Sequence, residues 1–153
     1  MKVYLDTSAF VKRYCEEEGS KAISDIFESD NEIVTSHWTL AEATAAIDRK
    51  VAKKQITAEE RDLSLSILFS DILDKNITLV RLSDEFLYPI IEKILTHHIS
   101  ADDALQLFSC IVSISPLFLA CDKSLLKAAA KEGLESINIE KAEDRQRLKE
   151  LIE

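Results

Sequence analysis

Short apolar runs alternate with longer segments of helical periodicity along the chain. The apolar runs are rich in β-prone residues and predict strands at 3–5, 33–35, 77–80, 116–120 and 137–139. Between them, apolar positions spaced about 3.6 residues apart predict helices over 7–14, 20–27, 38–54, 57–72, 83–98, 100–111 and 123–131, with a charged helix after the last strand. Strands that alternate with helices favour parallel pairing, with helices on both faces of the sheet. The pattern therefore predicts an α/β fold of three layers, α/β/α, with a mostly parallel central sheet.

Local signals mark where several of these helices begin and end. Thr57 and Glu60 have the spacing of a capping box, and Ser100 with Asp103 resembles another helix start. Ser20 is expected to cap the second helix, and Gly133 to stop the helix before the last strand. No repeat or linker interrupts the sequence, so residues 1–153 are expected to form a single domain.

Composition and charge narrow the class of protein. Apolar residues make up 46% of the chain and charged residues 31%, with a net charge of −9, which is typical of a globular protein. The two glycines stand far apart, so no glycine-rich phosphate loop can form. No membrane span or export signal is recognisable, and the 3 cysteines form no CxxC pair. We therefore expect reduced thiols and a cytoplasmic location without membrane association.

Four acidic residues stand where the predicted elements meet. Asp6 and Asp122 each follow a strand, and Glu42 and Asp103 lie in the first turns of helices. Each alone has a structural explanation, as a helix cap or as a charge that favours the helix dipole. Together they are expected at the carboxyl edge of the sheet, where α/β proteins bind ligands. Converging carboxylates suit a hard cation such as Mg²⁺ or Mn²⁺, which indicates phosphate-ester chemistry.

Four segments of the sequence resemble, in order, the motif regions of PIN domains, and most of all the VapC-type toxins of toxin–antitoxin pairs. These segments are YLDTSAFVKRYCEEEGS, VTSHWTLAEATAAIDRK, ISADDALQLF and LFLACDKSLLKAAAKEGL. The resemblance implies a Mg²⁺- or Mn²⁺-dependent endoribonuclease in which Asp6, Glu42, Asp103 and Asp122 are the catalytic, metal-binding acids. It assigns the principal ion to Asp6 and Asp103, and its waters or a second ion to Glu42 and Asp122. It also implies an RNA substrate, a cognate antitoxin protein and a homodimer.

The sequence departs from the family pattern at two positions. Many relatives carry Ser or Thr where this chain has Ala120, and His where it has Gln106. Ser8 is a candidate to supply the missing hydroxyl and Gln106 to orient a neighbouring group or the substrate, whereas Thr7 is expected to cap the first helix. These departures leave a non-catalytic PIN-like interaction module as the alternative function.

The remaining interpretations concern other folds and the basic residues. A dehalogenase-type phosphatase needs an acid where Ser8 stands, and a receiver domain needs an early acidic pair that this chain lacks. Lys12 and Arg13 follow the first motif and are candidates to contact RNA phosphates, but a solvated helix face is the favoured interpretation for both. The basic cluster at Arg49, Lys50, Lys53 and Lys54 is expected to complement the end of its helix rather than to bind RNA.

Overall fold

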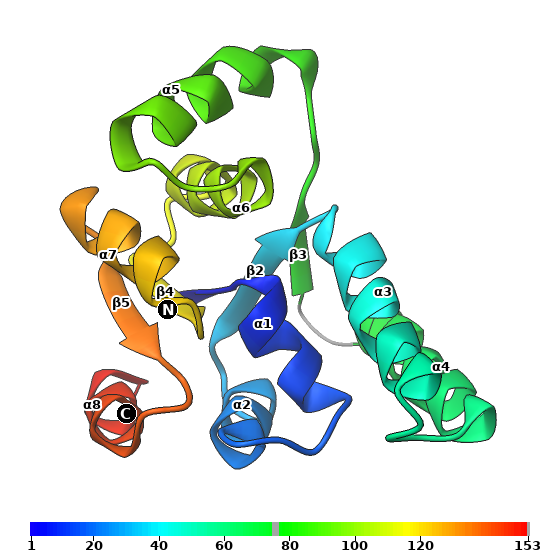
Figure 1. The fold of residues 1–153 in the computed structure, drawn as a ribbon. Coiled ribbons are helices and arrows are strands. Elements are labelled where there is room, and N and C mark those ends of the chain that lie inside the picture. The colour runs from blue at the N-terminus through cyan, green and yellow to red at the C-terminus, as the bar shows by residue number, and fades with distance from the viewer. Residues whose placement is uncertain (75–76, 153) are drawn as a thin grey trace.

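The chain folds around one five-stranded parallel sheet (Figure 1). The computed structural model describes residues 1–74 and 77–152. The strands are β1 (Lys2–Leu5), β2 (Glu32–Ser36), β3 (Ile77–Val80), β4 (Leu117–Ala120) and β5 (Glu135–Asn138). Their order is β3-β2-β1-β4-β5, and each neighbouring pair is parallel. The predicted sheet is confirmed, with β5 lying slightly earlier than expected because Glu135 already pairs with Leu117.

Helices cover both faces of the sheet and complete the three predicted layers (Figure 1). One face carries α1 (Thr7–Phe10), α2 (Ser20–Phe27), α3 (Thr39–Ala52), α4 (Ala58–Asp74) and α8 (Ala142–Ile152). The other carries α6 (Ala101–Val112) and α7 (Lys123–Lys131), with α5 (Leu87–His97) lying over α6. Short 3₁₀ turns, Val11–Arg13 and Asp84–Phe86, follow α1 and precede α5. No helix in the described residues is long and apolar enough to cross a membrane.

Two hydrophobic cores lie on the two faces of the sheet, and β1 contributes to both. Val3 and Leu5 pack into the core beneath α1, α2 and α3, whereas Tyr4 packs into the core beneath α6 and α7. Successive side chains of a strand point to opposite faces, so a continuous apolar run is what a sheet covered on both faces requires. The central strands are therefore buried, and their polar functional groups must lie at their ends.

The helix ends follow most of the predicted signals. The capping box is confirmed, because Thr57 N donates to Glu60 Oε2 at 2.7 Å and Glu60 N donates to Thr57 Oγ1 at 3.1 Å. Ser100 caps α6 as expected. The prediction for Ser20 was wrong: Gly19 is the N-cap of α2, with a left-handed φ of 93°. The Ser20 hydroxyl instead bonds to Cys15 O and Glu17 N, which turns the preceding loop back on itself.

The winding of the chain reverses between β1 and β4. From β1 the chain adds β2 and β3 on one side, and it then returns to add β4 and β5 on the other. Helices that leave two such neighbouring strands diverge to opposite faces, which opens a crevice at the carboxyl ends of the strands. This crevice lies directly beyond Leu5 and Ala120, where the sequence places Asp6 and Asp122.

Candidate active site

Asp6 and Asp122 are held side by side by the ends of the two central strands. Leu5 pairs with Leu119, and Asp6 N donates to Leu119 O at 3.0 Å. Both acids cap the following helix: Asp6 Oδ2 accepts from Ser8 N at 3.0 Å, and Asp122 Oδ1 accepts from Leu125 N at 2.8 Å. The capping interpretation and the site interpretation are therefore compatible. The cap fixes one oxygen of each carboxylate and leaves the second available to a ligand.

Ser8 links these two strand ends. Its hydroxyl donates to Asp6 Oδ2 at 2.6 Å and accepts from Cys121 N at 3.0 Å. The hydroxyl therefore ties the Asp6 carboxylate to the backbone directly before Asp122. Ala120, in contrast, is fully buried in the core beneath α6 and α7. The structure thus gives Ser8 the orienting contact for which it was a candidate.

Glu42 is held by two side chains from other parts of the fold. Gln106 Nε2 donates to Glu42 Oε1 at 2.6 Å, and Thr7 Oγ1 donates to the same oxygen at 3.0 Å. Thr7 was expected to cap α1; it is instead the first residue of that helix, and its hydroxyl contacts Glu42. Gln106 is itself fixed by the Tyr4 hydroxyl, which donates to Gln106 Oε1 at 2.8 Å in the buried core. Gln106 therefore orients a carboxylate of the site through its amide.

Asp103 approaches from the start of α6. Ser100 Oγ accepts from Asp103 N at 3.2 Å, which is half of the expected capping box. This cap sets the first turn of α6 so that Asp103 lies on the wall of the cleft. Asp102, one position earlier, is exposed and does not line the cleft.

All four predicted acids line one cleft of about 380 Å³. They reach it from four elements that are distant in sequence: the ends of β1 and β4 and the first turns of α3 and α6. The remaining lining residues include small or hydroxyl-bearing side chains and a set of charged groups: Thr7, Ser8, Val11, Lys12, Glu17, Ala46, Arg49, Cys121 and Glu140. The predicted convergence of the acids on one cleft is what the fold produces.

Three carboxylates of this cleft, those of Asp6, Glu42 and Asp103, have raised pKa values. Burial, together with the neighbouring charges of Asp6 and Asp122, raises the pKa of Asp103 to about 6. Burial also raises the pKa of Asp6, although the hydrogen bonds from Ser8 oppose this effect. The pKa of Glu42 is raised by burial as well, against the hydrogen bonds from Gln106 and Thr7. Among the described residues, none of the four acids has an ion-pair partner. The cleft therefore has the electrostatic character of a cation site.

Comparison with known proteins identifies the family. The model of the PIN domain matches residues 3–131, a range that contains all four acids. The chain belongs to the PIN domain family. PIN domains are generally nucleases that use divalent metal ions.

Solved structures agree with this assignment at the level of the fold. The crystal structure of PAE2754 from Pyrobaculum aerophilum is similar, with a TM-score of 0.56 and 17% sequence identity over 89% of this chain and 92% of that one. At this identity the likeness shows the fold alone. No curated protein sequence matches the chain.

The donor set of this PIN domain fits a hard divalent cation in its chemistry. Carboxylate oxygens are the preferred ligands of Mg²⁺ and Mn²⁺. Asp6, Glu42 and Asp122 are each anchored by hydrogen bonds to one oxygen, so a cation can bind to the other. Within residues 1–74 and 77–152, no three His, Cys, Asp or Glu side chains form a ready-made metal-binding group. The acids therefore suit a divalent cation in ligand type and in charge. Their carboxylates would have to move closer together to bind one ion jointly.

A cluster of paired charges also lines the cleft, and it was not predicted from the sequence. Lys12 was expected on a solvated face, but it is only 3% exposed. Its ammonium lies 2.9 Å from Glu140 Oε1 and 3.1 Å from Glu17 Oε2, and Glu17 also pairs with Lys50. Burial lowers the pKa of Lys12, but the hydrogen bonds to Glu140 and Glu17 outweigh this effect and leave it raised. The one sign of this cluster in the sequence is the DTSAFVK segment, which places Lys12 six positions after Asp6.

The absence of a side chain at Gly19 lets the two loops that carry Glu17 and Glu140 pack together. A Cβ at Gly19 would lie 2.6 Å from Ile139 O, directly before Glu140. The loop that carries Glu17 therefore packs against the loop that carries Glu140 only because residue 19 has no side chain. This close approach brings both carboxylates within reach of Lys12.

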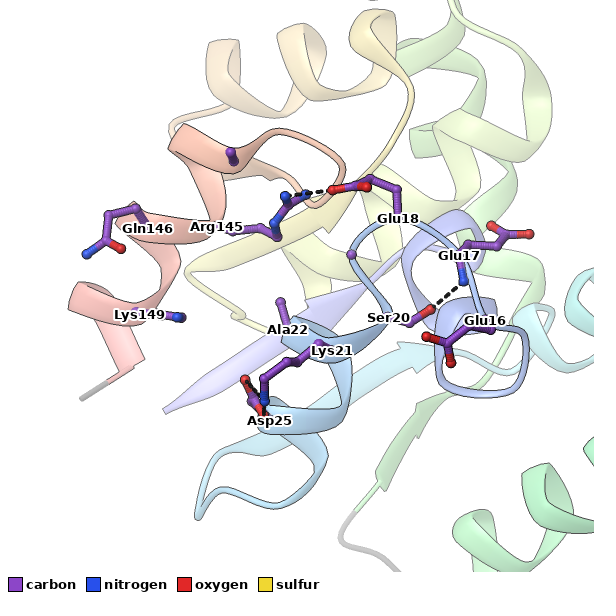
Figure 2. A pocket seen from close by; sticks show the side chains of 12 residues that line it. Glu16, Glu17, Glu18, Ser20, Lys21, Ala22, Asp25, Arg145, Gln146 and Lys149 are labelled. Atoms are coloured by element: carbon purple, nitrogen blue, oxygen red, sulfur yellow. Dashed lines mark hydrogen bonds and ion pairs between the residues drawn. The ribbon is translucent and has the colours of Figure 1, made fainter.

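A second hollow, of about 510 Å³, lies between the loop before α2 and helix α8 (Figure 2). Arg145 Nη2 lies 2.6 Å from Glu18 Oε1 and joins the two walls, and Lys21 pairs with Asp25 within α2 at 3.0 Å. None of the four site carboxylates lines this hollow. Its ion pairs already match acid with base, so we place the functional site of the PIN domain in the carboxylate cleft.

Proposed function

We propose that this PIN domain is a divalent-metal-dependent endoribonuclease of the VapC type, the toxin of a toxin–antitoxin pair. The observation that carries the proposal is the cleft itself, in which Asp6, Glu42, Asp103 and Asp122 meet without a basic partner among the described residues. Such a cleft repels RNA unless cations bind first, and cations bound to it attract a phosphodiester. The family resemblance supplies RNA as the substrate class.

The family resemblance suggests the role of each acid. Asp6 and Asp103 would hold the principal ion, while Glu42 and Asp122 would hold its waters or a second ion. Bound Mg²⁺ or Mn²⁺ polarises a phosphoryl oxygen and makes water a better nucleophile at neutral pH. Water then attacks phosphorus in line, the bond to the 3′ oxygen breaks, and the products carry a 5′-phosphate and a 3′-hydroxyl.

The chain's own contribution is preorganisation. Ser8 fixes Asp6, and Gln106 with Thr7 fixes Glu42, so that each of these carboxylates has one oxygen anchored and the other available to an ion. Gln106 does this from the core, where Tyr4 holds its amide. The two departures from the family pattern therefore do not remove a metal ligand.

Cleavage of total cellular RNA tests the proposal. Purified protein is incubated with Mg²⁺, with Mn²⁺ and with a chelator, beside an Asp6→Asn variant that keeps the size and the capping oxygen of Asp6. Discrete products with 5′-phosphate ends, formed only with metal and absent with the variant, are expected. If folded protein forms no product in any condition and binds no Mn²⁺, the non-catalytic module is the better interpretation.

The partners are part of the same proposal. Apolar side chains left exposed on α4 and α5 support a protein partner. Among them, Leu73 is 84% exposed and Tyr88 is 80% exposed. We propose that the chain forms a homodimer and binds a cognate antitoxin that brings a basic side chain to the acidic cleft. Light scattering of the protein alone, and co-purification with the product of a neighbouring short gene, test these two statements. The single domain over residues 1–153 and the cytoplasmic location remain predictions.

A further inference from the structure

We propose that one face of α3 forms the path by which the RNA backbone leaves the carboxylate cleft. The path consists of Glu42, Ala46, Arg49 and Lys53, which we call the α3 stripe. Arg49 and Lys53 contact phosphates on one side of the bond to be cut. The inference rests on the proposed function, because Glu42 marks the position of the reacting phosphate.

Helical geometry aligns the four residues. At 3.6 residues per turn, positions 42, 46, 49 and 53 fall within a narrow arc of the helix surface. Three of them, Glu42, Ala46 and Arg49, line the cleft. With a rise of about 1.5 Å per residue, Arg49 lies about 10 Å and Lys53 about 16 Å beyond Glu42 along the axis. Lys53 directly follows the last helical residue, and its φ of −83° continues the turn.

Ala46 leaves room for the RNA backbone between Glu42 and Arg49. It lines the cleft and has only a methyl group as its side chain. A backbone that passes over Ala46 therefore reaches Arg49 without displacing a long side chain. The order along the stripe is an acid at the reacting phosphate, then a gap, then two cations at increasing distance.

Arg49 and Lys53 keep their charge available. Of the two basic residues that line the cleft, Lys12 is buried between Glu17 and Glu140. Arg49 and Lys53 are exposed, and neither forms an ion pair with any residue in the described part of the chain. On a protein of net charge −9, a phosphate backbone is repelled by most of the surface. A stripe of uncompensated positive charge that begins at the cleft is therefore a favourable exit.

The helix dipole alone does not explain this arrangement. It favours any basic residue at the end of α3, and Lys50 and Lys54 also lie there. Lys50 turns aside to pair with Glu17, however, and Lys54 departs from helical geometry with a φ of 57°. Only Arg49 and Lys53 continue the line that Glu42 and Ala46 begin, and this alignment with the cleft indicates substrate contact.

Binding of single-stranded RNA tests the stripe without any need for cleavage. Fluorescence anisotropy of a labelled oligouridine is measured with the full chain at a fixed concentration of Ca²⁺, which binds carboxylate oxygens and so reduces the repulsion between the cleft and RNA, over a range of KCl concentrations. The variants are Arg49→Gln and Lys53→Gln, alone and combined. The controls are Lys54→Gln, at the same helix end but off the stripe, and Lys131→Gln, at the far end of α7. All four changes remove one positive charge from an exposed side chain.

Removal of one phosphate-binding cation lowers the slope of log affinity against log salt by about 0.7 for a single strand. We expect a reduction of about 0.7 for each stripe variant and about 1.4 for the double variant, with a smaller change for either control. Equal slopes for stripe and control variants, or no RNA binding by the unmodified protein, would overturn the path. RNA binding that depends on the stripe, without metal-dependent cleavage, would retain the path and reject the proposed nuclease. Metal-dependent cleavage together with RNA binding that does not depend on the stripe would retain the proposed nuclease and reject the path.

Discussion

Asp103→Asn is expected to stabilise the metal-free protein at neutral and alkaline pH. Burial, helped by the charges of Asp6 and Asp122, raises the pKa of Asp103 from 3.8 to about 6. The folded protein therefore binds the Asp103 proton more tightly than the unfolded chain does. The contribution of Asp103 to the free energy of unfolding is greatest below pH 3.8, falls as the pH rises to about 6, and stays low above that.

The size of the effect follows from the two pKa values. The difference between 3.8 and about 6 corresponds to ~3 kcal/mol of repulsion and lost solvation in the ionised form. Because the carboxyl is only partly buried, solvent screening reduces this value to about 1–2 kcal/mol. The asparagine removes the charge and keeps the shape, so the variant should gain about that amount at pH 8. The gain should shrink toward zero as the pH falls to about 4, where the carboxyl of the folded wild type is protonated.

Urea denaturation in chelator, at pH 8 and pH 4, measures this difference. Asp102→Asn is the matched control, because Asp102 lies in the same first turn of α6 and contributes the same helix-dipole term, but is exposed outside the cleft. It should change the free energy of unfolding by no more than a few tenths of a kcal/mol at either pH. If Asp103→Asn gives no gain at pH 8, or a gain that persists unchanged at pH 4, the electrostatic account of the cleft is wrong.

Three further predictions concern the support of the site and its charge. Gln106→Leu should lower the free energy of unfolding by about 1–3 kcal/mol in urea denaturation, because the buried Tyr4 hydroxyl loses its acceptor and Glu42 a donor. Gly19→Ala should cost about 1–3 kcal/mol in the same assay, since its Cβ would lie 2.6 Å from Ile139 O at a φ of 93°; an unchanged midpoint would mean that the loops do not touch. Mn²⁺ added to chelator-treated wild type should raise the melting temperature as ligand binding does, whereas a flat titration would argue against a cation site.

Much of the fold could be predicted from the sequence because its determinants are local. The apolar runs of β1 and β4, the capping box at Thr57 and the cap at Ser100 each depend on a few neighbouring residues. The order of strands and helices then limits the topology to a parallel sheet with covered faces. Asp6 and Asp122 could be placed at the sheet edge for the same reason, since each directly follows a strand.

Other predictions failed where a long-range contact decides the environment. Thr7 stands at a helix start, which suggests a cap, but its hydroxyl donates to Glu42, 35 positions away. Ser20 also looked like a cap, but the N-cap of α2 is Gly19, whose left-handed backbone packs closely against Ile139 O. Neither contact can be predicted from the residues next to Thr7 or Ser20 in the sequence.

The sequence by itself therefore determined the elements, the α/β class and the four acids, because periodicity, capping and strand ends are properties of short segments. Only the tertiary structure decided what surrounds those acids. The packing of β1 against α6 brings Gln106 to Tyr4, 102 positions away, and the closure of two loops brings Glu140 to Lys12, 128 positions away. The burial and pairing of a polar group depend on which distant segments cover it, so the charge balance of the cleft exists only in the folded chain.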